Sequence, residues 1–229
     1  MKSKLFIYCL LGLLTACSPN YFKKYASTEE RWKKEVSELV ALDKTEPDPS
    51  DGILFIGSSS IRLWKNIHQD MLPYHAIRRG YGGASFTDLI HFTDDLVYPH
   101  QFKALVVFVA NDITGSAEDR TPEEVLGLAK TVVKTVRKKY PHVPIFQVSI
   151  TPTPSRWKVW AKQKQANELM KAYFSGHKNL YFIDTEAAYL NEKGEPRGEL
   201  FISDNLHQKQ QGYDLWASLI KQSLNAHLK

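Results

Sequence analysis

The chain has 229 residues, of which 43% are hydrophobic and 24% are charged. This length supports one α/β domain with a sizeable core and leaves no room for a second full domain. The formal charge is +5; without Lys2 and Lys4, which belong to the N-terminal segment described next, 28 basic residues face 25 acidic ones, or +3. This mild excess, with no dense basic stripe interleaved with aromatics, predicts no nucleic-acid partner.

The first residues are typical of a bacterial export signal. Two lysines precede an apolar run at 5–14, which is too short to span a bilayer comfortably but right for a signal-peptide core. The run ends in Leu-Thr-Ala-Cys at 14–17, which resembles the lipobox of bacterial lipoproteins. We therefore expect a lipoprotein-type signal peptide over 1–16, a lipid on Cys17, a membrane tether over 17–30 and the folded domain over 31–229. An ordinary signal peptide or a short membrane anchor is the alternative.

This interpretation predicts an exported protein held at the cell envelope by its lipid. Ser18 after the cysteine favours the outer membrane in a Gram-negative cell, again by resemblance. Cys9 lies in the segment to be removed, so the mature chain keeps only Cys17 and forms no intramolecular disulfide.

Hydrophobic periodicity predicts a helix around 32–40, ended by prolines and a glycine within 47–52. Strands and helices then alternate. Strands are expected at 53–56, 76–77, 104–109, 145–150 and 180–183, and helices at 61–67, from Ser85, at 121–140, 157–175 and 212–228. This order predicts a three-layer α/β/α sandwich, a doubly wound, flavodoxin-like parallel sheet of about five strands.

Polar groups follow the predicted strands, where open parallel sheets bind their ligands. Gly-Ser-Ser-Ser at 57–60 follows the first strand, and Gly-Tyr-Gly-Gly-Ala-Ser at 80–85 follows the second. Asn111 and Asp112 follow the third strand, and Asp-Asn-Leu-His at 204–207 precedes the last helix. Each piece alone is commonly a turn, a cap or a surface loop. Their occurrence in this order predicts one polar site at a single edge of the sheet.

Four segments together resemble the conserved blocks of the SGNH hydrolases, the GDSL-like lipase and acylhydrolase family. They are LFIGSSSIRLW at 54–64, RGYGG at 79–83, NDI at 111–113 and DNLHQKQQGY at 204–213. The resemblance covers about residues 50–225. It implies Ser59 as nucleophile, Gly83 and Asn111 as oxyanion-hole residues, and Asp204 with His207 as the rest of a triad.

Physical chemistry fits these roles. A serine hydroxyl is a poor nucleophile until a base takes its proton, and histidine is the natural base near neutral pH. Asp204 precedes His207 by three residues, a spacing that brings side chains together on a helical turn. The Asp204 carboxylate would then orient the His207 imidazole. The backbone N–H groups of Ser59 and Gly83 and the Asn111 amide would bind the oxyanion.

The sequence departs from the family pattern at three positions. Ser58 replaces the aspartate of Gly-Asp-Ser, Arg78 replaces an asparagine, and Val109 replaces a glycine close to Asn111. We keep Ser58, Trp157 and Trp160 as candidate substrate-pocket residues, although packing is the commoner role for such a tryptophan pair.

The resulting prediction is a serine esterase that cleaves short acyl or acetyl esters of small molecules, carbohydrates or lipids. Acyl transfer through the same acyl-serine is one alternative, and a non-catalytic envelope binding module is another. The Gly-x-Ser-x-Gly elbow of α/β-hydrolases is excluded because Ile61 occupies its last place. The histidines show no metal-ligand spacing, so we expect no metal or other cofactor.

Overall fold

The structure, a computed structural model, describes residues 20–228. The predicted signal peptide over 1–16 and the lipidation site Cys17 lie outside the described residues. Within 20–228, no helix is long and apolar enough to cross a membrane.

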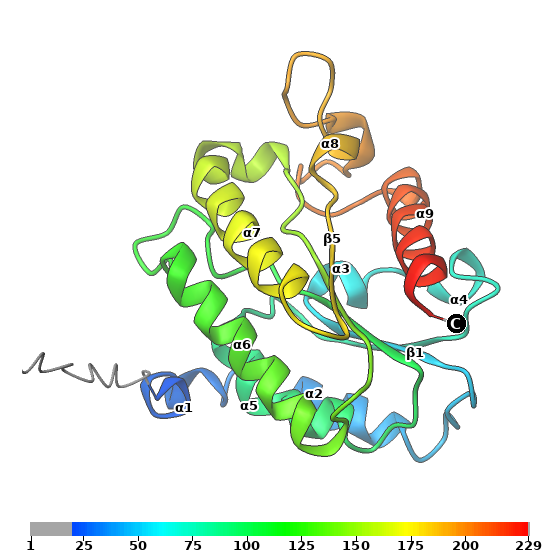
Figure 1. Cartoon of the computed structure of the whole chain (residues 1–229). Coiled ribbons are helices and arrows are strands. Elements are labelled where there is room, and N and C mark those ends of the chain that lie inside the picture. Colours follow the sequence, from blue (N-terminus) through cyan, green and yellow to red (C-terminus); the bar gives the residue numbers. More distant parts are fainter. Residues whose placement is uncertain (1–19, 229) are drawn as a thin grey trace, which may run out of the picture.

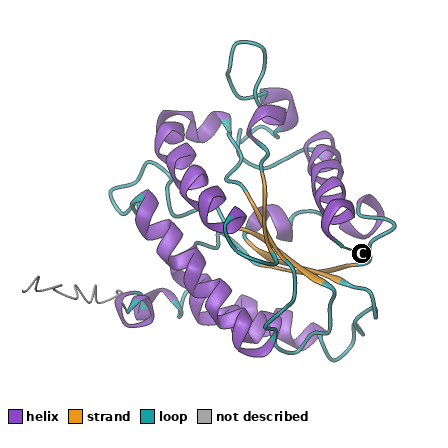
Figure 2. Ribbon diagram, in the orientation of Figure 1, coloured by secondary structure: helices purple, strands orange, loops and turns teal. Residues whose placement is uncertain are grey.

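A five-stranded parallel sheet lies at the centre of the domain (Figures 1 and 2). Its strand order is β2-β1-β3-β4-β5, and every neighbouring pair is parallel. The strands are β1 (Ile53–Gly57), β2 (Ala76–Gly80), β3 (Ala104–Phe108), β4 (Ile145–Val148) and β5 (Leu180–Ile183). All residues of β1 and β3 are buried, as expected for central strands covered on both faces.

Helices cover both faces of this sheet and complete the predicted three-layer α/β fold (Figure 2). One face carries α2 (Lys33–Leu42), α5 (Phe86–Val97), α6 (Pro122–Lys139) and α7 (Trp160–Ser175). The other carries α3 (Ser59–Arg62), α4 (Ile67–Asp70) and α9 (Gln210–His227). The single helix expected at 61–67 is thus two short helices.

Local signals in the sequence predicted the start of two helices of the first face, α5 and α6. Ser85 and Asp88 form the capping box at the start of α5. Thr121 caps α6 by accepting the Glu124 N–H at 3.2 Å, and Pro122 occupies the first helical position.

The N-terminal segment differs from the expected tether over 17–30. Residues 20–30 begin the folded domain, with α1 (Tyr21–Lys24) and a 3₁₀ turn, η1 (Ala26–Thr28). Tyr25 is 5% exposed and belongs to the core, and the Thr28 hydroxyl donates to the Thr87 carbonyl oxygen at 2.9 Å. Tyr21 packs so closely on Gly127 that a Cβ there would lie 2.1 Å from its hydroxyl oxygen. Residues 20–30 therefore pack on the domain, because Tyr25 is buried in the core and Tyr21 lies against α6.

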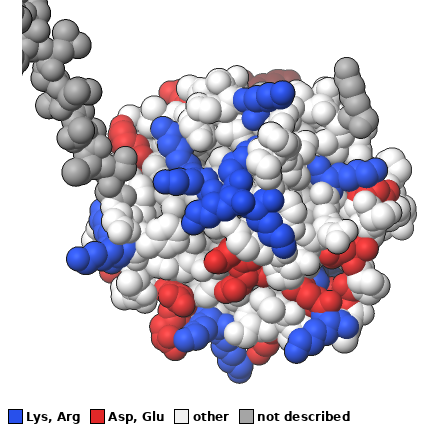
Figure 3. Space-filling view, turned by 60° about the horizontal axis from the view of Figure 1, so that its bottom comes forward, with Lys and Arg blue, Asp and Glu red and all other residues white. Residues whose placement is uncertain are grey.

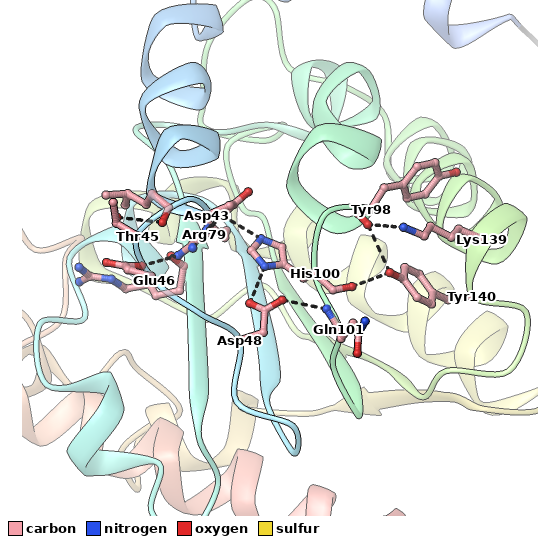
Figure 4. Close-up of polar contacts among 12 residues, drawn as sticks. Asp43, Thr45, Glu46, Asp48, Arg79, Tyr98, His100, Gln101, Lys139 and Tyr140 are labelled. Atoms are coloured by element: carbon pink, nitrogen blue, oxygen red, sulfur yellow. Dashed lines mark hydrogen bonds and ion pairs between the residues drawn. The ribbon is translucent and has the colours of Figure 1, made fainter.

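A buried ion cluster fixes the connection from α2 to β1 against edge strand β2 (Figure 4). Arg79, 2% exposed, donates to Asp43 at 2.8 Å and to Glu46 at 3.1 Å. His100, 1% exposed, lies 2.8 Å from an oxygen of Asp48 and 3.4 Å from Asp43. Removing Asp43 would leave the buried Arg79 guanidinium with only the largely exposed Glu46 as its ionic partner, which is destabilising.

An extension lies between β5 and α9, where the sequence analysis predicted no helix or strand. It contains α8 (Glu186–Tyr189), a projecting loop closed by the Leu190–Pro196 bridge, and η3 (Gly198–Leu200) (Figure 1). A second antiparallel bridge joins Phe201 to Gln208. Because this bridge flanks residues 204–207, the extension places the predicted Asp–His pair.

The face seen in Figure 3 carries mixed charge. Lys and Arg side chains gather near its middle, and groups of Asp and Glu lie beside them. The last turn of α6 contributes three basic residues at 137–139 to the surface charge of the chain. This mixture agrees with solvated helix faces.

Candidate active site

Ser59 lies at the turn from β1 into α3. Gly57 ends the strand with φ of +131°, and a Cβ there would lie 1.9 Å from the Phe108 carbonyl oxygen. The N–H of Ser58 donates to this same oxygen at 2.9 Å, so the turn is held against β3. Only glycine permits this approach. The turn therefore presents Ser59 as the first residue of α3 at the carboxyl edge of the sheet.

His207 reaches the same edge from the loop before α9. A tight turn, not a helix, holds it: Asn205 has φ of +57°, and the Ile202 N–H donates to the His207 carbonyl at 2.9 Å. One oxygen of Asp204 accepts the backbone N–H groups of Leu206 and His207, both at 2.9 Å. The predicted proximity of Asp204 and His207 is thus present, although the turn produces it.

The three side chains form a continuous hydrogen-bonded chain. His207 Nε2 lies 2.9 Å from Ser59 Oγ, and Nδ1 lies 2.6 Å from Asp204 Oδ2. Burial raises the pKa of Asp204, but hydrogen bonds from the His207 ring and from the two backbone N–H groups outweigh it and hold the pKa below its usual value. Asp204 is therefore an acceptor, so Nδ1 carries the proton and Nε2 can accept the Ser59 hydroxyl proton.

Gly83 and Asn111 come together from the ends of β2 and β3. A Cβ at Gly83 would lie 4.0 Å from Asn111 Nδ2, so the two predicted oxyanion donors are neighbours. The glycine loop at 80–85 is held in place by α2 and by Trp32, the residue that precedes α2. Glu35 accepts the N–H of Gly82 at 2.9 Å, and the Trp32 ring lies where any Cβ on Gly82 would be.

A small cavity of about 30 Å³ lies beside Ser59, His207 and Asn111. Its lining is Ser58, Ser59, Ser60, Phe108, Ala110, Asn111, Ile150, Thr151, Thr153, Arg156, Gln163, Phe201, Leu206, His207, Gln208 and Trp216. Ser58, a candidate pocket residue, is thus part of the lining. Space of this size takes about one water molecule or a methyl group.

Trp157 and Trp160 do not line this cavity. They stack on each other with ring centroids 6.0 Å apart; Trp160 is 8% exposed and Trp157 is 37% exposed. Packing thus accounts for Trp160, whereas Trp157 is exposed.

Two departures from the family pattern also lie away from the cavity. Val109 is fully buried in the core, so its side chain does not narrow the site. Arg78 donates to the carbonyls of Arg62 and Trp64 at 3.0 and 3.2 Å and thereby braces the end of α3.

A second, larger cleft of about 520 Å³ meets the site at Gly83 and Asn111. Its walls are mostly polar, and Trp32 is their one aromatic side chain. The other lining residues are Ser27, Thr28, Arg31, Ser85, Thr87, Asp88, Asp112, Thr114, Ser116, Glu118, Asp119 and Arg120. Asn111 lines both spaces and therefore lies between them.

Sequence reasoning missed two residues at this site. Arg156 follows β4 and contacts Asn111, and Glu35 from α2 holds the glycine loop. Inspection of the segment after the fourth strand, as was done for the first three, would have drawn attention to Arg156. No local pattern marks Glu35, because its partner is a backbone group 47 residues away.

A Ser–His–Asp chain at the carboxyl edge of a parallel sheet, with backbone and amide donors beside the serine, is the geometry that serine hydrolases use. The sequence model of the GDSL-like lipase/acylhydrolase family matches residues 56–215. The chain belongs to this family, and it is a carboxylic ester hydrolase of the SGNH type.

Several known proteins are similar to the chain in sequence or in fold. Platelet-activating factor acetylhydrolase IB subunit alpha1 from Homo sapiens is 26% identical over 196 residues, which cover 80% of this chain and 78% of the human one. A GDSL-like lipase from Bacteroides thetaiotaomicron superposes with a TM-score of 0.66 at 17% identity, covering 88% of this chain and 99% of its own. An acetyl xylan esterase superposes with a TM-score of 0.58 at 18% identity, covering 76% and 99%.

Proposed function

We propose that the chain hydrolyses short-chain esters, above all acetyl esters, with Ser59 as nucleophile, His207 as general base and Asp204 as the group that orients it. The observation that carries this proposal is the continuous contact from Asp204 through His207 to Ser59, at 2.6 and 2.9 Å. These distances lie within the range in which a base takes up a proton directly.

The reaction proceeds in two halves. Ser59 Oγ attacks the ester carbonyl carbon while its proton moves to His207 Nε2, and the N–H groups of Ser59 and Gly83 and the Asn111 amide bind the oxyanion. His207 then gives the proton to the departing alkoxide, which leaves as the alcohol. In the second half, His207 takes a proton from water, the hydroxide adds to the acyl-serine, and the acid departs as Ser59 regains its proton.

The two spaces that meet at Asn111 support assignments for the two parts of the substrate. The 30 Å³ cavity fits the methyl group of an acetyl ester and is too small for a long acyl chain. The open polar cleft, with its hydroxyls, charges and Trp32, suits a hydroxyl-rich alcohol better than a lipid. The printed names of two relatives, an acetylhydrolase and an acetyl xylan esterase, point to the same acyl group.

Acyl transfer to a sugar hydroxyl remains the alternative, since it needs the same acyl-serine. The assay that separates the two measures free acetate and acetylated acceptor in one reaction mixture. Release of acetate in proportion to ester consumed supports hydrolysis, and recovery of acetylated acceptor supports transfer.

We further infer export and anchoring of the domain through a lipid on Cys17. The support is the charged, apolar and small-residue order of positions 2–17. Cys17→Ala should release the protein from the membrane fraction while leaving ester hydrolysis by the domain unchanged.

The decisive test of the catalytic assignment is Ser59→Ala, with Ser218→Ala, an exposed serine of α9, as the matched control. A fluorophosphonate probe should label Ser59, and the Ser59→Ala variant should lose both labelling and hydrolysis of p-nitrophenyl acetate, by about 10⁵-fold or more. The Ser218→Ala variant should keep both. A fully active Ser59→Ala enzyme, or a folded wild type that resists the probe, would favour the binding-module interpretation.

A further inference from the structure

Arg156 makes an unusual pair of contacts at the edge of the small cavity. It lies in the 3₁₀ turn η2 (Pro154–Val159), which follows β4. Its Nη1 donates to the Ala110 carbonyl at 2.7 Å, and its Nη2 donates to Asn111 Oδ1. Burial lowers the pKa of Arg156, with Asp119 and Asp112 acting against the shift. A desolvated guanidinium is thus directed at two adjacent acceptors beside Ser59.

These contacts determine which way the Asn111 amide faces. A guanidinium carries only donors, so only the Oδ1 side of the amide can face Arg156. The opposite side carries Nδ2, which donates one hydrogen to the Ala84 carbonyl at 2.8 Å. A carbonyl oxygen only accepts, so this second contact requires the same orientation. One Nδ2 hydrogen remains for a ligand at the site.

The result is an oxyanion donor whose geometry is set before substrate arrives. Without Arg156, Oδ1 would lose its partner, and only the contact of Nδ2 with the Ala84 carbonyl would hold the amide in place. Preorganised donors stabilise a transition state because they need no reorientation during the reaction. A cation bound to Oδ1 also polarises the amide and makes its remaining N–H a stronger donor.

We propose that Arg156 is the positioning residue of the oxyanion hole, acting through Asn111. This inference rests on the proposed function, in which Asn111 binds the oxyanion. Because that bond strengthens in the transition state, loss of Arg156 should lower kcat while leaving KM nearly unchanged. Arg156 also lines the small cavity, so direct binding of an anionic acyl group is the rival role, and it would instead alter KM for such substrates.

The experiment is a double-mutant cycle on p-nitrophenyl acetate with Arg156→Met, Asn111→Ala and the double variant. Asn111→Ala should lower kcat by about 10²–10³-fold, the usual loss for one oxyanion donor. Arg156→Met should lower kcat by about 10–100-fold in the wild type and by less than about threefold when Asn111 is already alanine. Arg156→Lys, which keeps the positive charge and can donate to one of the two acceptors, should recover part of the loss.

Arg137→Met is the matched control, because Arg137 is also half-buried and donates to backbone carbonyls, among them that of Val143 at 2.7 Å. It lies in the last turn of α6 and should leave kcat unchanged. Thermal melts of every variant identify loss of folding, and Arg156→Lys supplies the comparison if Arg156→Met unfolds. An equal effect of Arg156→Met in both backgrounds, or a change confined to KM, overturns the positioning role. Ser59→Ala in the same assay separates the two hypotheses: its full activity would overturn the catalytic assignment and this inference together.

Discussion

Acyl-chain selectivity follows from the size of the cavity beside Ser59. Its volume of about 30 Å³ leaves room for a small group such as the methyl group of an acetyl ester. A butyryl group carries two further methylenes, which displace packed side chains. Overpacking of this kind costs about 1–3 kcal/mol. We therefore expect kcat/KM to fall by about 5- to 150-fold from p-nitrophenyl acetate to butyrate, and to fall further for octanoate.

Leu206→Ala provides the matching gain of function. Leu206 lines the cavity and is half-buried, so its truncation enlarges the space with a modest loss of stability. The butyrate-to-acetate ratio of kcat/KM should rise by about tenfold, since each accommodated methylene contributes about 1 kcal/mol or more. Leu219→Ala is the control, because Leu219 is a half-buried leucine of α9 packed on the core outside this cavity.

Steady-state rates with the ester series measure both effects. Octanoate turned over as well as acetate would show that the acyl chain lies elsewhere. An unchanged ratio in Leu206→Ala, or the same change in Leu219→Ala, would refute the assignment of the cavity to the acyl group.

Two further predictions concern stability. Gly57→Ala should lower the free energy of unfolding by about 3 kcal/mol or more in urea melts, because φ is +131° and the new Cβ would meet the Phe108 carbonyl at 1.9 Å; a wild-type midpoint would contradict this. Burial raises the pKa of Asp112 to about 7 from 3.8, so the native state keeps a proton that the unfolded chain releases. The stabilisation that the protonated Asp112 carboxyl gives the native state is fully present below pH 3.8 and is lost as pH rises toward 7. The free energy of unfolding should fall by up to about 4 kcal/mol over this range. Asp112→Asn should therefore show less loss of stability than wild type between pH 4 and 7, and parallel curves would refute the assignment.

Much of the fold was predictable from local patterns. Strand β5 begins and ends where its apolar run predicts, and the caps at Ser85 and Thr121 place α5 and α6. Alternation of strands and helices was enough to predict a parallel sheet, because consecutive parallel strands require a crossover. The extension between β5 and α9 was missed because its short elements carry no periodic signal and are held by isolated bridges.

For the candidate site, the sequence by itself determined which residue types stand after each strand, and thus Ser59, Gly83, Asn111, Asp204 and His207 as candidates. Only the tertiary structure decided their approach: His207 Nε2 reaches Ser59 Oγ across 148 positions of the chain at 2.9 Å. The tertiary structure also added Glu35 and Arg156 to the residues of the site, and it placed residues 20–30 in the domain. The physical reason is that hydrogen bonds between distant segments, and the burial of aromatic side chains such as Tyr25, depend on how elements pack and leave no trace in local spacing.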